Sequence, residues 1–104
     1  MQLQQEMQRS YYAAQMRNAL RNEPCSPDAV TQARIDEVVQ ALALGCTLRK
    51  PRMFRNRLMT AGDFQRIAGK ITMTQVCVVV DALIKHKNNI SNRTWYILGM
   101  LSRY

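Results

Sequence analysis

The chain has 104 residues, enough for one small domain, and 47% of them are hydrophobic, which excludes a wholly disordered protein. The formal net charge is +8. Residues 38–104 contain eleven Lys and Arg residues but only two acidic residues, Asp63 and Asp81. A localised positive field favours DNA, RNA or an acidic protein surface as partner, although it also serves solubility alone.

The cysteines and the apolar runs bear on the compartment. Cys25, Cys46 and Cys77 are far apart and form no C-x-x-C pair, so we expect neither disulfides nor a zinc site. Cys77 lies in the apolar run 76–80 and is predicted to be a buried thiol. No secretory leader is visible, and this run is too short to span a bilayer. We therefore expect a cytoplasmic protein without metal, cofactor or membrane partner.

The first predicted helix lies within residues 1–22 of what we expect to be a single domain, 1–104. It places Met7, Tyr11 and Leu20 near one face, with Gln and Arg elsewhere. This polar helix is the natural contact for a second copy of the chain, so we expect a homodimer.

The second predicted helix lies within residues 26–45. Ser26 is a good N-cap, Pro27 suits the first helical position, and Gly45 fits the end. Its apolar residues recur at helical spacing, which predicts a core helix.

A basic segment follows at residues 49–57. Five of its nine residues are cationic: Arg49, Lys50, Arg52, Arg55 and Arg57. Pro51 breaks a helix that runs into it, and a short helix could start at Arg52. Guanidinium groups suit phosphate contacts, and Phe54 either stacks on a base or fills the core. The segment predicts contact with nucleic acid or an acidic partner, the alternative being a solvated linker.

Residues 59–98 open with a third helix. Thr60 is a plausible N-cap with Asp63 three residues later, which resembles a capping box. Phe64 belongs to the apolar face of this helix, and Gly69 is predicted to end it.

A fourth helix is predicted at residues 75–86, with Thr72 or Thr74 as its cap. Its valines also permit a strand, because β-branched residues favour sheets. Residues 94–104 form either a short strand or a terminal helix, and Trp95 is expected to anchor the core.

The succession of short helix, glycine turn, threonine-rich cap and second helix resembles the helix-turn-helix domains of bacterial transcription regulators, especially the winged-helix ones. The matching residues are Phe64, Ala68, Gly69, Val76, Val79 and Leu83. Gln65 stands where the family has a small residue, and the spacing from Gly69 to Val76 is one residue longer than usual. These departures favour the looser winged variety.

The resemblance implies a mainly α fold, a small helical domain with a short β wing near residues 88–98. In such domains the start of the second helix reads bases and the turn contacts phosphate. The residues that correspond here are Lys70, Thr72, Thr74 and Gln75. Arg93 would lie near the wing tip and reach phosphate or the minor groove.

These observations predict a small DNA-binding transcriptional regulator whose partner is double-stranded DNA. Catalysis finds little support, because His86 is the single histidine and no nucleophilic constellation surrounds it. One alternative is a phage- or plasmid-type inhibitor or adaptor that docks its basic segment and Tyr11-Tyr12 on an acidic protein surface. Another is an RNA-binding accessory protein.

Overall fold

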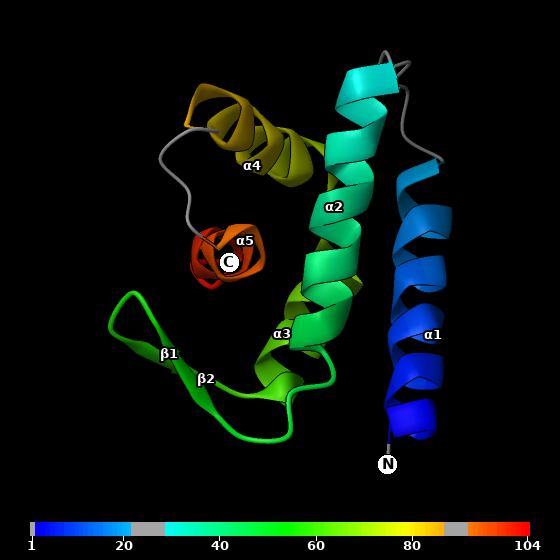
Figure 1. Ribbon diagram of the computed structural model, residues 1–104, viewed down its shortest axis with the longest axis vertical. Coiled ribbons are helices and arrows are strands. Elements are labelled where there is room, and N and C mark those ends of the chain that lie inside the picture. The colour runs from blue at the N-terminus through cyan, green and yellow to red at the C-terminus, as the bar shows by residue number, and fades with distance from the viewer. Residues whose placement is uncertain (1, 22–28, 87–91) are drawn as a thin grey trace.

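The computed structural model describes residues 2–21, 29–86 and 92–104 (Figure 1). Its elements, in chain order, are α1 (Gln2–Arg21), α2 (Ala29–Gly45), β1 (Arg52–Phe54), β2 (Arg57–Met59), α3 (Ala61–Lys70), α4 (Met73–Lys85) and α5 (Arg93–Leu101). The prediction of a mainly helical small domain is therefore confirmed. The predicted signals at residues 22–28 lie outside the described residues.

Helix α2 is the centre of the fold. It packs against α1 on one side and against α3, α4 and α5 on the other, as Figure 1 shows. Val38, Val39 and Leu42 form a buried stripe at helical spacing, and Ala41 and Ala43 on either side of it are buried as well, so more than one face of α2 contributes to the core. Most of the core lies between α2 and the C-terminal half of the chain.

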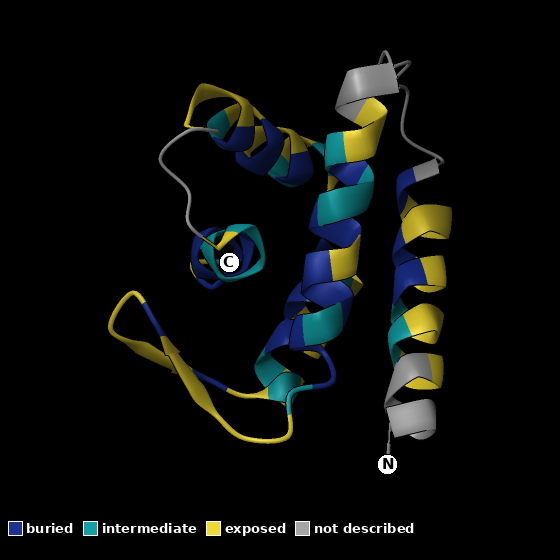
Figure 2. Cartoon of the chain, in the orientation of Figure 1, coloured by how far each residue is buried: buried dark blue, intermediate teal, exposed yellow. Residues whose placement is uncertain are grey.

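Helix α1 lies alongside α2, with a buried stripe facing it and an exposed stripe facing solvent (Figure 2). The buried residues are Ala13, Met16 and Leu20. The predicted apolar face is therefore rotated: Leu20 is buried, but Met7 and Tyr11 are exposed. Residues 13, 16 and 20 follow the i, i+3, i+7 spacing of one helix face, and positions 7 and 11 fall outside that face.

Capping interactions set the start of α3 and α4. The backbone N–H of Asp63 donates to Thr60 Oγ1 at 3.2 Å, and the backbone N–H of Thr60 donates to Asp63 Oδ2 at 2.9 Å. This bond and the one from the Thr60 hydroxyl lower the pKa of Asp63. Thr72 and Gln75 form the same reciprocal arrangement at α4. The predicted cap at Thr60 is confirmed, and α3 continues one residue past Gly69.

The two helices that follow β2 meet at a sharp corner. Residues 71–72 join α3 to α4, and the two axes bend by 112° there. In the described part of the chain no single helix is long and apolar enough to cross a membrane. There, only α3 and α4 taken together reach that length and apolar composition.

The predicted β wing near residues 88–98 is wrong in its position. Residues 87–91 lie outside the described part, and residues 93–101 form α5. Asn92 caps this helix by accepting from the backbone N–H of Trp95 at 3.1 Å. Ile97 and Leu98 are both fully buried, which a one-sided strand with alternating faces cannot achieve. The strand pair of this domain is instead β1 and β2, where the basic segment was predicted to start a helix.

The cysteine prediction is corrected as well. Cys77 is exposed and Cys46 is buried, and burial raises the pKa of the Cys46 thiol to about 12. Helical spacing explains the difference: Val76, Val79 and Val80 occupy the inner positions of α4, so the residue after Val76 faces outward. Cys25 lies outside the described residues.

Phe64 joins four elements. Its ring is fully buried and lies edge-on to Phe54 of β1, with the ring centroids 5.5 Å apart. It also lies directly over Gly45 at the end of α2: a Cβ at this glycine would be 2.9 Å from Phe64 Cγ and 2.9 Å from Leu98 Cδ2 of α5. Only glycine permits this approach of α2, the hairpin, α3 and α5.

We predict that Gly45→Ala destabilises the protein by about 1–3 kcal/mol, because the added methyl group forces the buried Phe64 ring to move. The matched control is Gly69→Ala in α3, where an added Cβ meets nothing within 4 Å. The control should be neutral or slightly stabilising, since alanine favours a helix. Urea unfolding of both variants measures the difference. Equal stability of the two variants would contradict the close approach at Gly45.

Candidate nucleic-acid interface

The basic segment forms a two-residue β-hairpin. Arg55 and Asn56 have positive φ angles of 50° and 66°, which is the backbone of a type I′ turn. Asparagine tolerates this conformation better than most residues, and the turn's twist matches that of the strands. The strands pair antiparallel, with Met53 opposite Leu58. This turn, together with Pro51, explains why the segment is not helical.

The inner face of the hairpin fixes it to the helices. Phe54 and Met59 are buried, which confirms the core alternative for Phe54. Phe54 contacts Phe64 and also lies 5.9 Å from Trp95 of α5, measured between ring centroids. These aromatic contacts hold the hairpin in one orientation relative to α5.

Two of the basic residues share this inner face. The guanidinium of Arg52 lies over the Trp95 ring at 4.5 Å from its centroid. Arg57 donates from Nη1 to the backbone carbonyl of Ser102 at 2.8 Å. Both residues remain exposed, but their positions are set by contacts within the chain, and they also attach the hairpin to the C-terminal helix.

The other three basic residues have no such role. Arg49, Lys50 and Arg55 are exposed, at the approach to β1 and at the hairpin turn. Among the described residues, none of the five cations of the segment forms an ion pair. The structure thus places Arg52, Arg55 and Arg57 on one hairpin and Arg49 and Lys50 just before it.

The outer face of the hairpin is apolar. Met53 and Leu58 are cross-strand partners and are 62% and 58% exposed. Their side chains point away from Phe54 and Met59, because neighbouring residues of a strand alternate between faces. The hairpin therefore presents an apolar pair between cationic side chains.

The second group of predicted site residues lies at the corner between α3 and α4. Lys70, Thr72 and Thr74 are exposed there, and Gln75 is half-buried. Gln75 is not wholly available to a ligand, because its Oε1 accepts from the backbone N–H of Thr72 at 3.1 Å. Thr72 is engaged in the same cap, so Thr74 and Lys70 are the least constrained members.

Beyond its first turn, α4 offers little to an anion. Its outward residues include Val78 and Ile84, which are 41% and 47% exposed. The charged residues on this side, Asp81 and Lys85, pair with each other at 3.1 Å. Any nucleic-acid contact by α4 is thus confined to its N-terminal end.

The two groups stand apart. The hairpin leads into the start of α3 and the corner follows its end, and the ten residues of α3 give a separation of about 15 Å. They are two separate groups of residues at opposite ends of α3.

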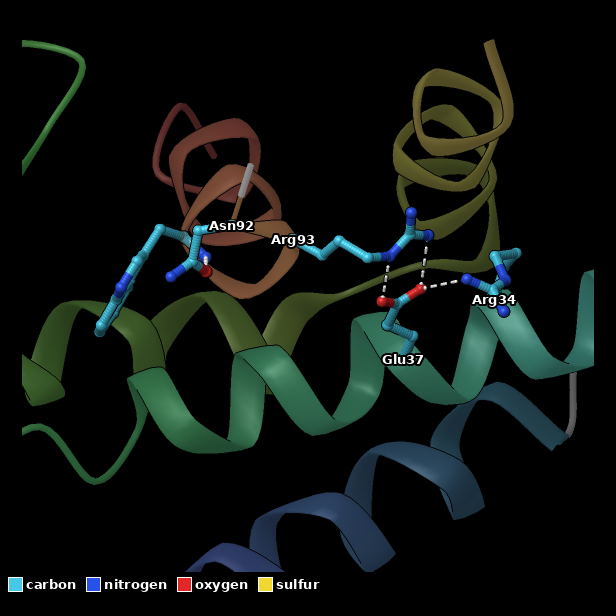
Figure 3. Close-up of polar contacts among 5 residues, drawn as sticks. Arg34, Glu37, Asn92 and Arg93 are labelled. Carbon is cyan, nitrogen blue, oxygen red and sulfur yellow. Dashed lines mark hydrogen bonds and ion pairs between the residues drawn. The ribbon is translucent and has the colours of Figure 1, made fainter. Parts of the chain in front are cut away.

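Arg93 does not lie at a wing tip, as the sequence had suggested. It begins α5, and its guanidinium binds the Glu37 carboxylate of α2, donating from Nε at 2.5 Å and from Nη2 at 2.8 Å (Figure 3). Arg34 donates to the same carboxylate at 2.8 Å. Both side chains of the Arg93–Glu37 pair are about 30% exposed or less. Arg93 therefore serves to attach α5 to α2.

Sequence reasoning missed a groove between the hairpin and α5. It has a volume of about 300 Å³, and Tyr96 and Gly99 of α5 line it together with Arg55 and Trp95. The alternative prediction, a strand over residues 94–98, would place Trp95 and Tyr96 on opposite faces, so the two would not line one groove. The signal that favours a helix is Asn92, whose side chain suits an N-cap, followed by apolar residues through Leu101.

Comparisons with protein-family models, with curated proteins and with solved structures find no match to this chain.

We predict that the Arg93–Glu37 pair makes stability depend on acid pH. Arg93 is the main cause that lowers the pKa of Glu37 from 4.5, its ordinary value, so the carboxylate stabilises the folded state when it is ionised. Relative to Glu37→Gln, the wild type should be more stable at pH 7. This advantage should decrease as the pH falls below 4.5 and disappear once it is below the pKa of the folded state.

Urea unfolding of both proteins between pH 7 and pH 3 tests this prediction. Asp36→Asn is the control, because Asp36 forms a more exposed pair with Arg17, at 3.6 Å, that is expected to contribute little. An advantage over Glu37→Gln that stays constant down to pH 3 would exclude a role for the ionised pair.

Proposed function

We propose that this protein binds double-stranded DNA and regulates transcription by occupying a site on it. The observation that carries the proposal is the basic segment: five exposed cations, none of them ion-paired within the described part of the chain, three on a hairpin that the buried Phe54 and Met59 attach to the core and two just before it. Two-stranded ribbons fit the major groove, and arginine suits phosphate oxygens. Binding through the hairpin would cost little conformational entropy, because the hairpin is already folded against the core.

Sequence reading is assigned to the start of α4. The 112° bend between α3 and α4 lies in the range of about 90–120° between the helices of helix-turn-helix motifs. Thr74 and Lys70 are exposed at that corner, where the first turn of a recognition helix meets base edges and phosphates. The hairpin then anchors the duplex about 15 Å away. A second copy, joined through the exposed side of α1 that carries Met7 and Tyr11, would double these contacts.

An acidic protein partner is the second candidate. The exposed pair Met53 and Leu58 favours it, because exposed apolar side chains beside a basic segment are expected at a protein interface. DNA phosphates are charged and provide no apolar surface against which this pair could be buried. The two candidates differ in salt dependence and in the effect of Met53→Ser with Leu58→Ser, which should weaken a protein partner and leave DNA binding intact.

We predict that the triple variant Arg49→Ala, Lys50→Ala, Arg55→Ala weakens DNA binding and flattens its salt dependence. The slope of log K against log salt should fall by about 0.9 for each phosphate that the variant can no longer neutralise. Arg52 and Arg57 are kept, because they contact Trp95 and Ser102. Fluorescence anisotropy with a labelled duplex at several salt concentrations measures the slope.

The control removes the same charge elsewhere: Arg17→Ala, Arg66→Ala, Lys85→Ala. Each of these residues lies in an exposed pair with a neighbouring carboxylate, so their removal should leave the fold and the slope nearly unchanged. If the control weakens binding as much as the hairpin variant does, the hairpin is not the contact region.

We further predict that Gln75→Glu weakens DNA binding while the fold remains intact. Glutamate keeps the oxygen that accepts from Thr72, so the cap of α4 is preserved. Its negative charge repels phosphate and cannot donate to adenine, so the affinity should fall by at least about tenfold if this turn faces DNA. Thermal melting and anisotropy measure the two effects, and unchanged affinity would remove α4 from the interface.

A further inference from the structure

Cationic and aromatic side chains make up most of the lining of the groove between the hairpin and α5. The lining residues are Arg52, Met53, Phe54, Arg55, Trp95, Tyr96 and Gly99. Two of these are arginines and three are aromatic, and no carboxylate is among the described residues that line it. At about 300 Å³, the groove is at the lower end of the range of pockets that hold small ligands.

Gly99 determines the depth of the groove. A Cβ on this residue would lie 3.7 Å from Arg55 Nε and 3.9 Å from its Cγ, which is ordinary van der Waals contact. The glycine therefore leaves a methyl-sized space beneath the Arg55 side chain, in the middle of a helix where alanine would be the better helix former. This space is on the groove floor and is not required by the core packing.

The aromatic and cationic groups are placed for stacking. Arg52 already lies over Trp95 at 4.5 Å from its centroid, and Trp95 and Tyr96 are each half-buried, with part of their surface open to the groove. Arginine planes and aromatic rings are the groups on which unpaired bases stack, while guanidinium groups hold the flanking phosphates. A base within a duplex is covered on both faces by its neighbours and cannot enter.

We propose that this groove binds an unpaired base of single-stranded nucleic acid, with Trp95 and Tyr96 against the base and Arg55 and Arg52 on its phosphates. The inference rests on the proposed nucleic-acid function and specifies a different form of the ligand. A peptide carboxylate would satisfy the arginines but would leave the two rings without a stacking partner, so the lining favours the nucleotide.

Trp95 is the single tryptophan of the chain, so its fluorescence reports on the groove directly. The probe is an octathymidylate, compared with an abasic octamer that carries the same number of phosphates. The octathymidylate should quench Trp95 and bind about tenfold more tightly than the abasic strand, since stacking is the difference between them.

The variant Gly99→Ala tests whether the nucleotide occupies this groove. The added methyl group fills the groove floor without a clash, so the variant should melt at the same temperature as the wild type or higher, yet bind octathymidylate about tenfold more weakly. Gly69→Ala is the matched control: the same change in another helix, with nothing within 4 Å of the new Cβ, should leave affinity unchanged. Equal affinity of the two variants would overturn the proposal.

Three further outcomes would also overturn it. Equal binding of the abasic strand would show a polyanion site only, and equal quenching by an octaglutamate peptide would assign the groove to an acidic protein. Duplex binding by anisotropy without any quenching of Trp95 by octathymidylate would reject the groove and leave the proposed function standing. Absence of duplex binding at low salt would reject the proposed function itself, whether or not the single strand binds.

Discussion

The contact between Phe64 and Gly45 is the constraint on which the rest of the structure depends. Helix α2 can end against α3 and α5 only because it carries no side chain at this point. The same ring receives Phe54 of the hairpin on its edge, so three separate segments share one aromatic side chain. Gln65, the next residue, donates to the carbonyl of Cys46 at 3.0 Å and satisfies an acceptor just beyond the end of α2. This bond explains why a long polar residue stands beside Phe64.

The basic hairpin and α5 depend on each other. Arg52 and Arg57 hold α5 through Trp95 and the carbonyl of Ser102, and Phe54 closes the contact from the buried side. At its N-terminal end α5 is also tied to α2 by Arg93 and Glu37. The arginines of this protein thus divide into those that bind the chain to itself and those left with uncompensated charge. Composition alone does not make this division.

Local features were predictable from the sequence and long-range ones were not. The cap at Thr60 depends on Asp63, three residues away, and the apolar spacing of Val76, Val79 and Leu83 depends on a single helix. The placement of the hairpin depends instead on the contact of Phe54 with Phe64, ten residues further along the chain, which no local pattern indicates.

The candidate site was likewise predictable only where it depends on neighbouring residues in the sequence. The cations at residues 49–57 were identified from local composition, and all five are exposed, three on the hairpin and two just before it. The partner of Arg93 is 56 residues away in sequence, so no local pattern indicated it. The Trp95 groove needs both the hairpin and α5 in place before it exists. Which ligand these regions bind stays a prediction, because charge and exposure describe the surface and not its partner.

The burial of Phe54 and Met59 links the hairpin to the cooperativity of the whole domain. Both belong to the same buried cluster as Phe64 and Leu42, so the ribbon cannot lift away without exposing the core to water. Its opening is therefore part of global unfolding and not a local fluctuation. A ligand that binds only the native hairpin would therefore stabilise every element of the domain at once, α2 included.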